Sequence, residues 1–512
     1  MGSGESSPRT RARVFLGVVR DAVLKTPAEC NPQVVAETRT NEDASLSLPL
    51  LVAHPPDAST HLPTGRGGYG GADETTPLTE AEDGGAPASE VSNGARVSRD
   101  AHLDNCKFFL MCVVVYNHCI QDFFKFLDPA TARGWCAPDS TDTLAFGGSV
   151  DLVRLARGFY LYLNLLGMPA FAAASGYCSR GWARDVRRGD GAGVNRRFRG
   201  AVESLIVPWL IWQPFYVLYN YRTYPVQLWS PIGVTWYLTA LFSWRVSLSA
   251  LAQARRGAIL PATLVAGVAV GFTDTPQTAN GLAFLDFQRA VAFAPVFYFG
   301  MTSVTPERLA ALKAKNATAV GWLATVGAAL AFVVMIRGAA EEKDASSSSS
   351  SFFGITTGTC CFDEIQRYLW MTSGYDYGGD PTDPSAAPLV HAFYRVVFYV
   401  SAFAVTSAFV AIVPVEQRWY TSYGSRTMYA YLLHLPLVRG LALAQDLCVP
   451  ESAQPPLWAQ ALINFVFLPL AGSVGLMAPW CERAFKGLVE PVKVFGGMWP
   501  WREFWEEDEE LL

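Results

Sequence analysis

The strongest constraint on this chain is a series of apolar segments that recur from about residue 105 to residue 480. Each is about 17 to 24 residues long, which is the length an α-helix needs to cross about 30 Å of hydrocarbon. Since 51% of the residues are apolar and only 17% are charged, an ordinary soluble protein is excluded. We predict an all-α polytopic membrane protein with about ten transmembrane helices in one bundle. The predicted helices cover residues 107–127, 158–178, 202–220, 232–250, 257–273, 288–304, 318–336, 392–414, 427–446 and 457–480.

The two ends of the chain have a different composition from the apolar region. Residues 1–100 are rich in Gly, Pro, Ser, Thr and acidic residues and contain no long apolar run, so we predict a disordered N-terminal tail. A transmembrane domain is expected over residues 101–485, with a long loop inserted at 338–390. Residues 486–512 form a predicted acidic tail.

The orientation follows from the basic residues in the loops, because Lys and Arg are retained on the cytoplasmic side. The connection between the second and third predicted helices is the most basic, so it is placed in the cytoplasm. Both termini are then cytoplasmic, and the 338–390 loop is exoplasmic. The arginines of that connection are Arg180, Arg184, Arg187, Arg188, Arg196, Arg197 and Arg199.

Charge and cysteine spacing exclude several classes of function. The net charge of −5 gives no basic excess with which to neutralise a phosphate backbone, so nucleic acid is excluded as a partner and membrane lipid is expected. No Cys/His pattern has metal-ligand spacing, so we expect no metal.

Ionisable groups at membrane depth are costly, and they are therefore candidates for function. His118 interrupts the first predicted helix. A neutral imidazole could take a proton from an attacking alcohol, so His118 is a candidate general base; the alternative is an interior histidine with a structural role. Asp122 follows four residues later on the same helix face and could orient the ring, or it could be an interfacial charge.

Two further ionisable residues interrupt predicted helices. His434 lies in a tyrosine-rich helix, which favours a structural role, although catalysis stays open. Arg289 opens the sixth helix, where it could pair with a carboxylate or bind a substrate phosphate or carboxylate.

The cytoplasmic arginines Arg196, Arg197 and Arg199 directly precede a predicted helix. They determine topology, and they could also capture an anionic ligand, because the positive end of the helix dipole adds to their attraction for phosphates. A nucleotide-bearing donor such as coenzyme A fits that arrangement.

Six segments together resemble the membrane acyltransferase 3 family, in particular its branch similar to fucose 4-O-acetylases. They occur in the family's order and span roughly residues 103–480. The segments are Asp104–Lys107 with His118, Met168–Phe171 with Ser175–Tyr177, Arg196–Arg199 with Val207–Trp212, Thr235–Leu241, Arg289 with Phe293, Pro295, Phe297 and Gly300, and Ser425–Tyr429 with His434.

The resemblance implies a ten-helix acyltransferase domain with an acyl-CoA donor on the cytoplasmic side and a hydroxyl acceptor, most often on a carbohydrate. It implies that His118 is essential, and that Arg289 and the basic turn help to hold the donor, for which we expect acetyl-CoA. We place Trp236 and Arg426, from two of the matching segments, among the donor-binding residues. Many bacterial relatives have a Glu in the segment that begins at Trp236, and this chain has none there.

Three functions therefore stay open at the level of sequence. The first is an O-acyltransferase in which His118 acts as general base or acyl relay. The second is a transporter or acyl exporter that uses the same His, Asp and Arg as a proton or anion path, although no internal repeat supports it. The third is a binding protein without catalysis, suggested by the missing acid.

Overall fold

A computed structural model describes residues 100–127, 152–219, 228–273, 284–305, 308, 317–344, 351–352, 355–356, 362–371, 375, 388–448, 459 and 462–496. The chain divides into two units, Met1–Ser98 and Arg99–Leu512, and every described residue belongs to the second. The predicted disordered tail, apart from Asp100, and the acidic end beyond residue 496 lie outside the described residues.

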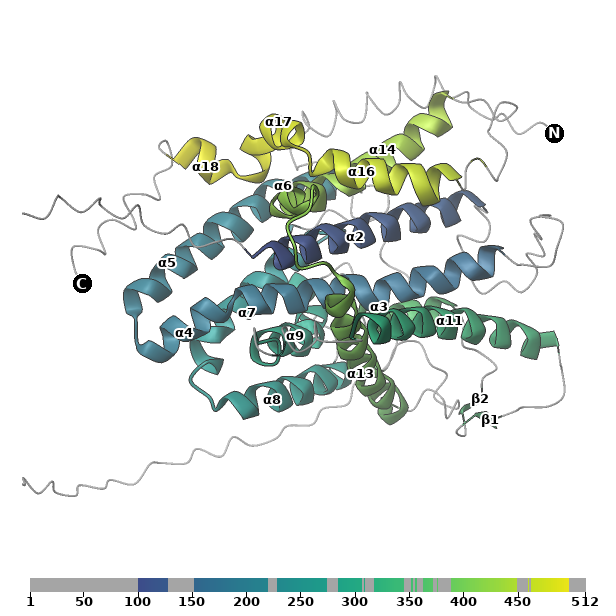
Figure 1. The fold of residues 1–512 in the computed structure, drawn as a ribbon, viewed down its shortest axis with the longest axis horizontal. Coiled ribbons are helices and arrows are strands. Elements are labelled where there is room, and N and C mark those ends of the chain that lie inside the picture. The colour runs from purple at the N-terminus through teal and green to yellow at the C-terminus, as the bar shows by residue number, and fades with distance from the viewer. Residues whose placement is uncertain are drawn as a thin grey trace, which may run out of the picture. The chain divides into compact units, whose positions relative to one another are not determined.

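The described residues are almost entirely helical (Figure 1). Each of the ten predicted segments coincides with a helix, which confirms the all-α fold class. The helices at these segments are α2 (Ala101–Leu127), α3 (Leu152–Cys178), η2 with α6 (Val202–Ile206, Val207–Tyr219), α7 (Trp236–Leu251), α8 with η3 (Arg256–Ala269, Val270–Phe272), α9 (Phe287–Thr302), α11 (Ala317–Asp344), α13 (Pro388–Ile412), α14 (Thr427–Cys448) and η9 with α16 (Ile463–Phe467, Leu468–Leu476).

Shorter elements occupy stretches that the sequence analysis treats as loops or as a tail. The predicted basic connection is a helical hairpin, α4 (Arg180–Arg188) and α5 (Gly191–Ala201), joined at Gly189, whose φ of 67° suits glycine. The remaining short elements are η4 (Phe284–Asp286), β1 (Ser351–Phe352), β2 (Ile355–Thr356), α12 (Phe362–Trp370), η7 (Thr421–Arg426), α17 (Pro479–Val489) and α18 (Pro491–Phe495), with β1 and β2 paired antiparallel.

Two continuous helices among the described residues are long and apolar enough to cross a membrane. They are Gly191–Leu218, with 28 residues, and Pro388–Ile412, with 25. A third is added if Ile463–Leu476 and Pro479–Val489, which meet at a bend of 67°, form one span. Arg256–Phe272 and Ala317–Phe332 are shorter apolar helical stretches. Helix α9 has only 16 residues, or about 24 Å of helix. The long apolar helices are compatible with membrane association.

Helix α3 is central to the packing and contacts α2, α9, α11 and α13 (Figure 1). Its crossing with α9 is a contact between backbones. A Cβ on Gly176 would overlap the carbonyl of Phe297, and a Cβ on Gly300 would overlap the carbonyl of Ala173. Small residues at a helix crossing allow this approach, so the two helices are closely locked together.

Candidate functional site

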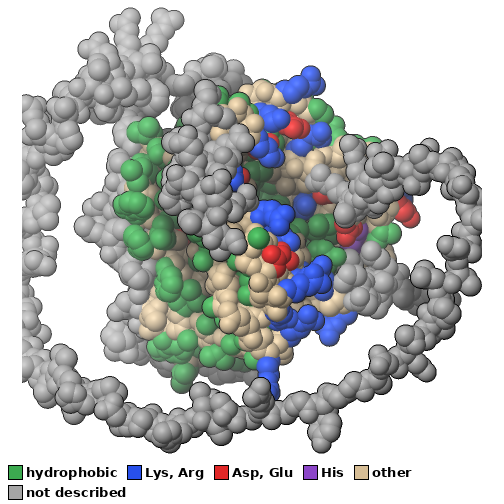
Figure 2. Space-filling view, turned by 90° about the vertical axis from the view of Figure 1, so that its left-hand side faces the viewer, with side chains coloured by type: hydrophobic (Ala, Val, Ile, Leu, Met, Phe, Trp, Pro, Cys, Tyr) green, Lys and Arg blue, Asp and Glu red, His purple; other side chains and the backbone are tan. Residues whose placement is uncertain are grey.

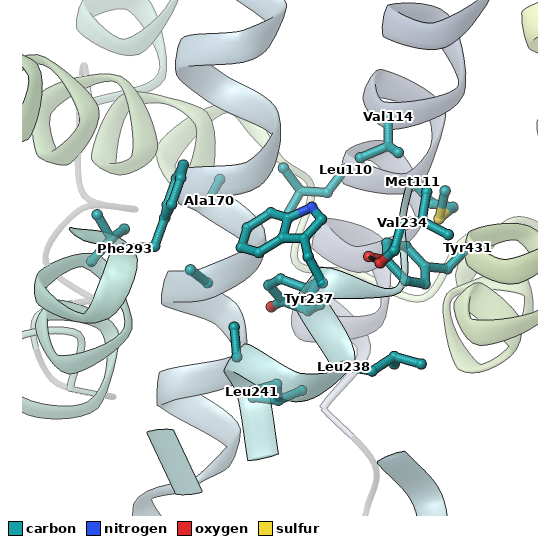
Figure 3. Packing of buried hydrophobic residues seen from close by; sticks show 14 of the residues in the cluster. Leu110, Met111, Val114, Ala170, Val234, Tyr237, Leu238, Leu241, Phe293 and Tyr431 are labelled. Carbon is teal, nitrogen blue, oxygen red and sulfur yellow. Dashed lines mark hydrogen bonds between the residues drawn. The ribbon is translucent and has the colours of Figure 1, made fainter. Parts of the chain in front are cut away.

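A polar cavity of about 280 Å³ lies among α2, α3, α7, α9, α12 and α14. Three of the residues singled out in the sequence, His118, Trp236 and Arg289, line it together although they are far apart in the chain. Val114 and Phe293, which also line it, belong to the buried hydrophobic cluster shown in Figure 3. The other polar residues of the lining are Asn117, Gln121, Asn164, Asp286, Trp370, Tyr431 and Arg439.

His118 reaches the cavity from the middle of α2. Its Nδ1 lies 3.1 Å from Oε1 of Gln121, one turn further along the helix. An amide oxygen only accepts hydrogen bonds, so this contact favours the tautomer with the proton on Nδ1 and a lone pair on Nε2. The structure thus gives Gln121 the orienting position that the sequence analysis assigns to Asp122. Asp122 belongs to α2, but its side chain lies outside the described part of the chain.

His434 lies directly behind His118, with the two ring centroids 5.0 Å apart. The His434 side chain is completely buried, and its Nδ1 donates to the carbonyl of Ala430 at 2.9 Å. Its Nε2 is buried with no hydrogen-bond partner among the described residues. A buried polar atom without a partner costs free energy, which marks this histidine as a candidate functional group beside the cavity.

Arg289 occupies the start of α9, where it contacts one aromatic and one acidic side chain. Its guanidinium carbon lies 3.7 Å from the ring centroid of Trp236, a cation–π contact. Its Nη1 lies 3.6 Å from Oδ2 of Asp286, and both side chains are only 14% exposed. Its Nε has no partner among the described residues. The buried positive charge is thus only partly compensated and can stabilise an anion in the cavity.

The backbone before α9 is unusual. Leu285 and Asp286 both have positive φ, at 51° and 50°, a backbone conformation that residues other than Gly, Asn and Asp rarely adopt. Local strain of this kind persists where surrounding contacts hold it, and here it presents Asp286 to Arg289.

Side-chain amides form a second polar wall of the cavity. Asn117 and Asn164 donate to each other's oxygens at 3.2 and 3.0 Å, which joins α2 to α3. The indole N–H of Trp370 on α12 donates to Oδ1 of Asn164 at 2.9 Å. Gln366, one turn earlier, donates to the Tyr160 hydroxyl at 2.8 Å. Helix α12, which comes from the predicted exoplasmic loop, is therefore part of the site.

The turn that carries Trp236 is held in place by Gln213, a buried residue of α6. Nε2 of Gln213 donates to the carbonyl of Ser230 at 2.7 Å, and its Oε1 accepts from the Thr235 hydroxyl at 2.6 Å. The Tyr431 hydroxyl donates to the carbonyl of Val234. These bonds fix the Trp236 side chain against the cavity.

The other sequence candidates lie away from this cavity. Arg197 and Arg199 form ion pairs with Asp185 and Glu203, at 2.5 and 2.9 Å. Arg196 is an exposed residue of α5. Arg426 donates to Glu482 on α17 at 2.6 Å. The structure thus brings His118, Trp236 and Arg289 together, with His434 behind them, and does not bring the basic turn or Arg426 to the cavity.

Several cavity residues escape the sequence analysis. Asn117, Gln121 and Asn164 are amides inside apolar segments, and the search for ionisable groups passes over them. Their presence within hydrophobic helices is the signal that could have found them, because buried amides need partners. Trp370 lies in a long loop and carries no such signal.

No three His, Cys, Asp or Glu side chains converge as a metal site in the part of the chain that the structure describes. Comparison with known proteins gives no relative, since no family model matches and no curated protein or solved structure is significantly similar to the chain.

Proposed function

We propose that the protein is an integral membrane O-acyltransferase that moves an acyl group, acetyl in the simplest case, from acyl-CoA to a hydroxyl of a carbohydrate or similar acceptor. The observation that carries the proposal is the meeting of His118, Arg289 and Trp236 in one polar cavity built by helices far apart in the sequence. The six resembling segments, which include these three residues, also support it. The cavity contains a candidate base and a candidate anion-stabilising group, as acyl transfer requires.

In the proposed reaction, His118 is the general base. Its Nε2 takes the proton of the acceptor hydroxyl while the oxygen attacks the thioester carbonyl. The carbon–sulfur bond then breaks, and the coenzyme A thiolate leaves with the proton that His118 returns. Arg289 and the nearby amides would stabilise the oxyanion, so the missing acid of the Trp236 helix is not required. In the relay form, His118 carries the acyl group briefly before passing it to the acceptor.

The proposed topology is a ten-helix membrane bundle with both termini in the cytoplasm. On that topology, α2 begins on the cytoplasmic side, and α7 and α9 begin on the exoplasmic side. His118 lies in the second half of α2, whereas Trp236 and Arg289 lie at or near the starts of α7 and α9. The cavity would then face the exoplasmic side, with α12 beside its opening for the acceptor.

The test is coenzyme A release from acetyl-CoA by detergent-purified full-length protein supplied with a mixed glycan pool. We expect release by the wild type, loss in His118→Ala, and retention in His102→Ala. His102 is a matched control because it lies on the same helix, is buried, and contacts the carbonyl of Val410 outside the cavity. Release unaffected by His118→Ala would remove this residue from the mechanism.

A transporter is the second candidate, and the pair of neighbouring histidines, His118 and His434, is the observation that favours it. Two imidazoles with ring centroids 5.0 Å apart, beside a polar cavity, could pass a proton through the bundle. Acetyl-CoA binding without coenzyme A release, together with proton flux in proteoliposomes that His434→Phe abolishes, would favour the transporter over the enzyme.

A further inference from the structure

A second polar pocket, of about 150 Å³, lies where α4 meets α8 and the end of α9. Four arginines line it: Arg180, Arg184, Arg187 and Arg256. The first three are spaced four and three residues apart, so they share one face of α4. Figure 2 views the side on which α4 lies in Figure 1, and Lys and Arg side chains gather there.

Two of these arginines are anchored to the ends of neighbouring helices. Nη1 of Arg180 donates to the carbonyl of Val304, just beyond α9, at 3.0 Å. Nε of Arg187 donates to the carbonyl of Ala252, just beyond α7, at 2.7 Å. These bonds hold the two guanidinium groups at the wall of the pocket. The long side chains are therefore already ordered, which reduces the entropy lost on binding a ligand.

The positive charge of the pocket is not balanced by its own lining. None of the lining residues is acidic, and Arg184 and Arg256 make no hydrogen bond or ion pair with a described residue. The acid nearest in sequence, Asp185, is hydrogen-bonded to Arg197 on α5, and its interaction with Arg184 is a weaker electrostatic one. Burial and the neighbouring charge of Arg256 lower the pKa of Arg187. Like charges held together without a counter-ion are the usual arrangement of an anion site.

The start of α8 adds to the positive potential. Arg256 is its first residue, and Arg255 before it gives no side-chain hydrogen bond to cap the helix. The amide N–H groups of the first turn are therefore not satisfied by a side-chain cap, and the helix dipole favours negative charge. The hydroxyls of Thr302 and Thr305 complete the lining with further polar groups.

We propose that this arginine pocket binds a phosphate group of a phosphoester ligand, and that Arg184 and Arg256 are its principal contacts. Guanidinium groups bind phosphate oxygens in pairs of hydrogen bonds, which suits a pocket lined by four of them. The phosphate could belong to coenzyme A, which rests on the proposed function, or to a phospholipid headgroup, which does not. The donor-binding position then shifts from Arg196, Arg197 and Arg199 on α5, two of which are already paired, to Arg184 on α4 and Arg256 on α8.

The position of the pocket suits a donor whose other end reaches the cavity. Arg289 and Thr302 stand near the two ends of α9, so the cavity and the arginine pocket are separated by about 20 Å of helix. A coenzyme A held by its phosphates has an extended pantetheine arm of comparable length with which to direct the thioester inward.

The experiment measures ligand binding by full-length protein in detergent and in nanodiscs, without turnover. The probes are coenzyme A, 3′-dephospho-coenzyme A, and nanodiscs of phosphatidylcholine with or without phosphatidic acid. The test variant is Arg184→Gln with Arg256→Gln. The matched control is Arg188→Gln with Arg255→Gln, which removes the same charge from neighbouring positions outside the pocket lining.

We expect the test variant to weaken coenzyme A binding by about tenfold or more, because charge-assisted hydrogen bonds are lost, and the control to stay within about twofold. Unchanged coenzyme A binding with a lost preference for phosphatidic acid would assign the phosphate to lipid. Binding of both ligands unchanged in the test variant would overturn the proposal. If wild type binds coenzyme A through these arginines yet releases none from acetyl-CoA, the pocket stands and the proposed acyltransferase fails.

Discussion

The contact between Arg289 and Asp286 makes the most direct prediction about the cavity. We consider Arg289→Met, which keeps an unbranched aliphatic stem and removes the charge. The substitution removes the cation–π contact with Trp236 and leaves the Asp286 carboxylate without its ion-pair partner. Both side chains are only 14% exposed, so water compensates little for the loss.

The magnitude follows from the geometry. At 3.6 Å and an effective dielectric constant of about 20, two unit charges attract each other by about 5 kcal/mol. Desolvation of the pair offsets part of this, and removing one partner from a buried pair costs about 3–5 kcal/mol. Arg426→Met provides the control, because its pair with Glu482 is more exposed and is expected to contribute about 1 kcal/mol or less.

The loss should also depend on pH. Burial raises the pKa of Asp286 above its ordinary value of 3.8, and Arg289 counteracts this. Because the folded-state pKa is raised, protonation of Asp286 favours folding at low pH, and that contribution disappears as the pH rises through the folded-state pKa. Without Arg289 this pKa rises further, so the destabilisation grows from acidic to neutral pH.

The assay is thermal unfolding of the purified protein in detergent at about pH 5 and about pH 8. We expect Arg289→Met to be closer to wild type at the lower pH, and Asp286→Asn to restore much of the stability of Arg289→Met at the higher pH. An equal loss at both pH values, with no rescue by Asp286→Asn, would refute the argument that an uncompensated carboxylate causes the defect.

Three further predictions concern other parts of the fold. Gly300→Ala should lower the unfolding temperature sharply because its Cβ overlaps the backbone of α3, whereas Gly327→Ala, which faces open space, should leave it unchanged. Trp370→Phe loses the indole hydrogen bond to α3, and we expect the free energy of unfolding, measured by denaturant titration, to fall by about 1 kcal/mol. We also expect the substitution to raise the KM for the acceptor more than the KM for acetyl-CoA. The hydrogen bond from Arg197 lowers the pKa of Asp185 below its ordinary value of 3.8. The pair therefore stabilises the fold above pH 3.8, and this stabilisation is lost as the pH falls through the folded-state pKa. Arg197→Gln should abolish that part of the acid sensitivity in unfolding scans between about pH 2 and pH 5.

The sequence predicts the helices well, because a long apolar run and a helix coincide in every one of the ten segments. It predicts less about which helices cross a membrane, since bends and short helices such as α9 do not follow from composition alone. Charged residues dominate the helical hairpin α4–α5, so its sequence predicts a loop and not two helices. Its ion pairs and the Asp190 cap, which accepts from the Gly193 amide at 2.8 Å, are contacts within the folded chain.

The sequence predicts those residues of the candidate site that are ionisable and lie within apolar segments, because burying such groups costs free energy. His118 and Arg289 were found in this way, and the structure places both at one cavity. The amide residues and Trp370 belong to the site only because of which helices pack together, and no periodicity in the sequence predicts that packing. In the hairpin, arginines of α5 form ion pairs, whereas arginines of α4 line a pocket. This difference also depends on a tertiary contact, the ion pair between Arg197 and Asp185.

The backbone contact between α3 and α9 has a consequence for how a ligand could enter. Where glycines bring two backbones into contact, neither helix can slide or rotate without steric overlap, so α3 and α9 behave as one rigid unit. Arg289 and Asn164 lie toward one end of the α3–α9 pair. Thr302 lies at the other end, where α3 leads into α4 at Arg180. The spacing between the two pockets is therefore constant, and any opening or closing of the cavity must come from α2, α7, α12 or α14, the other helices that line it.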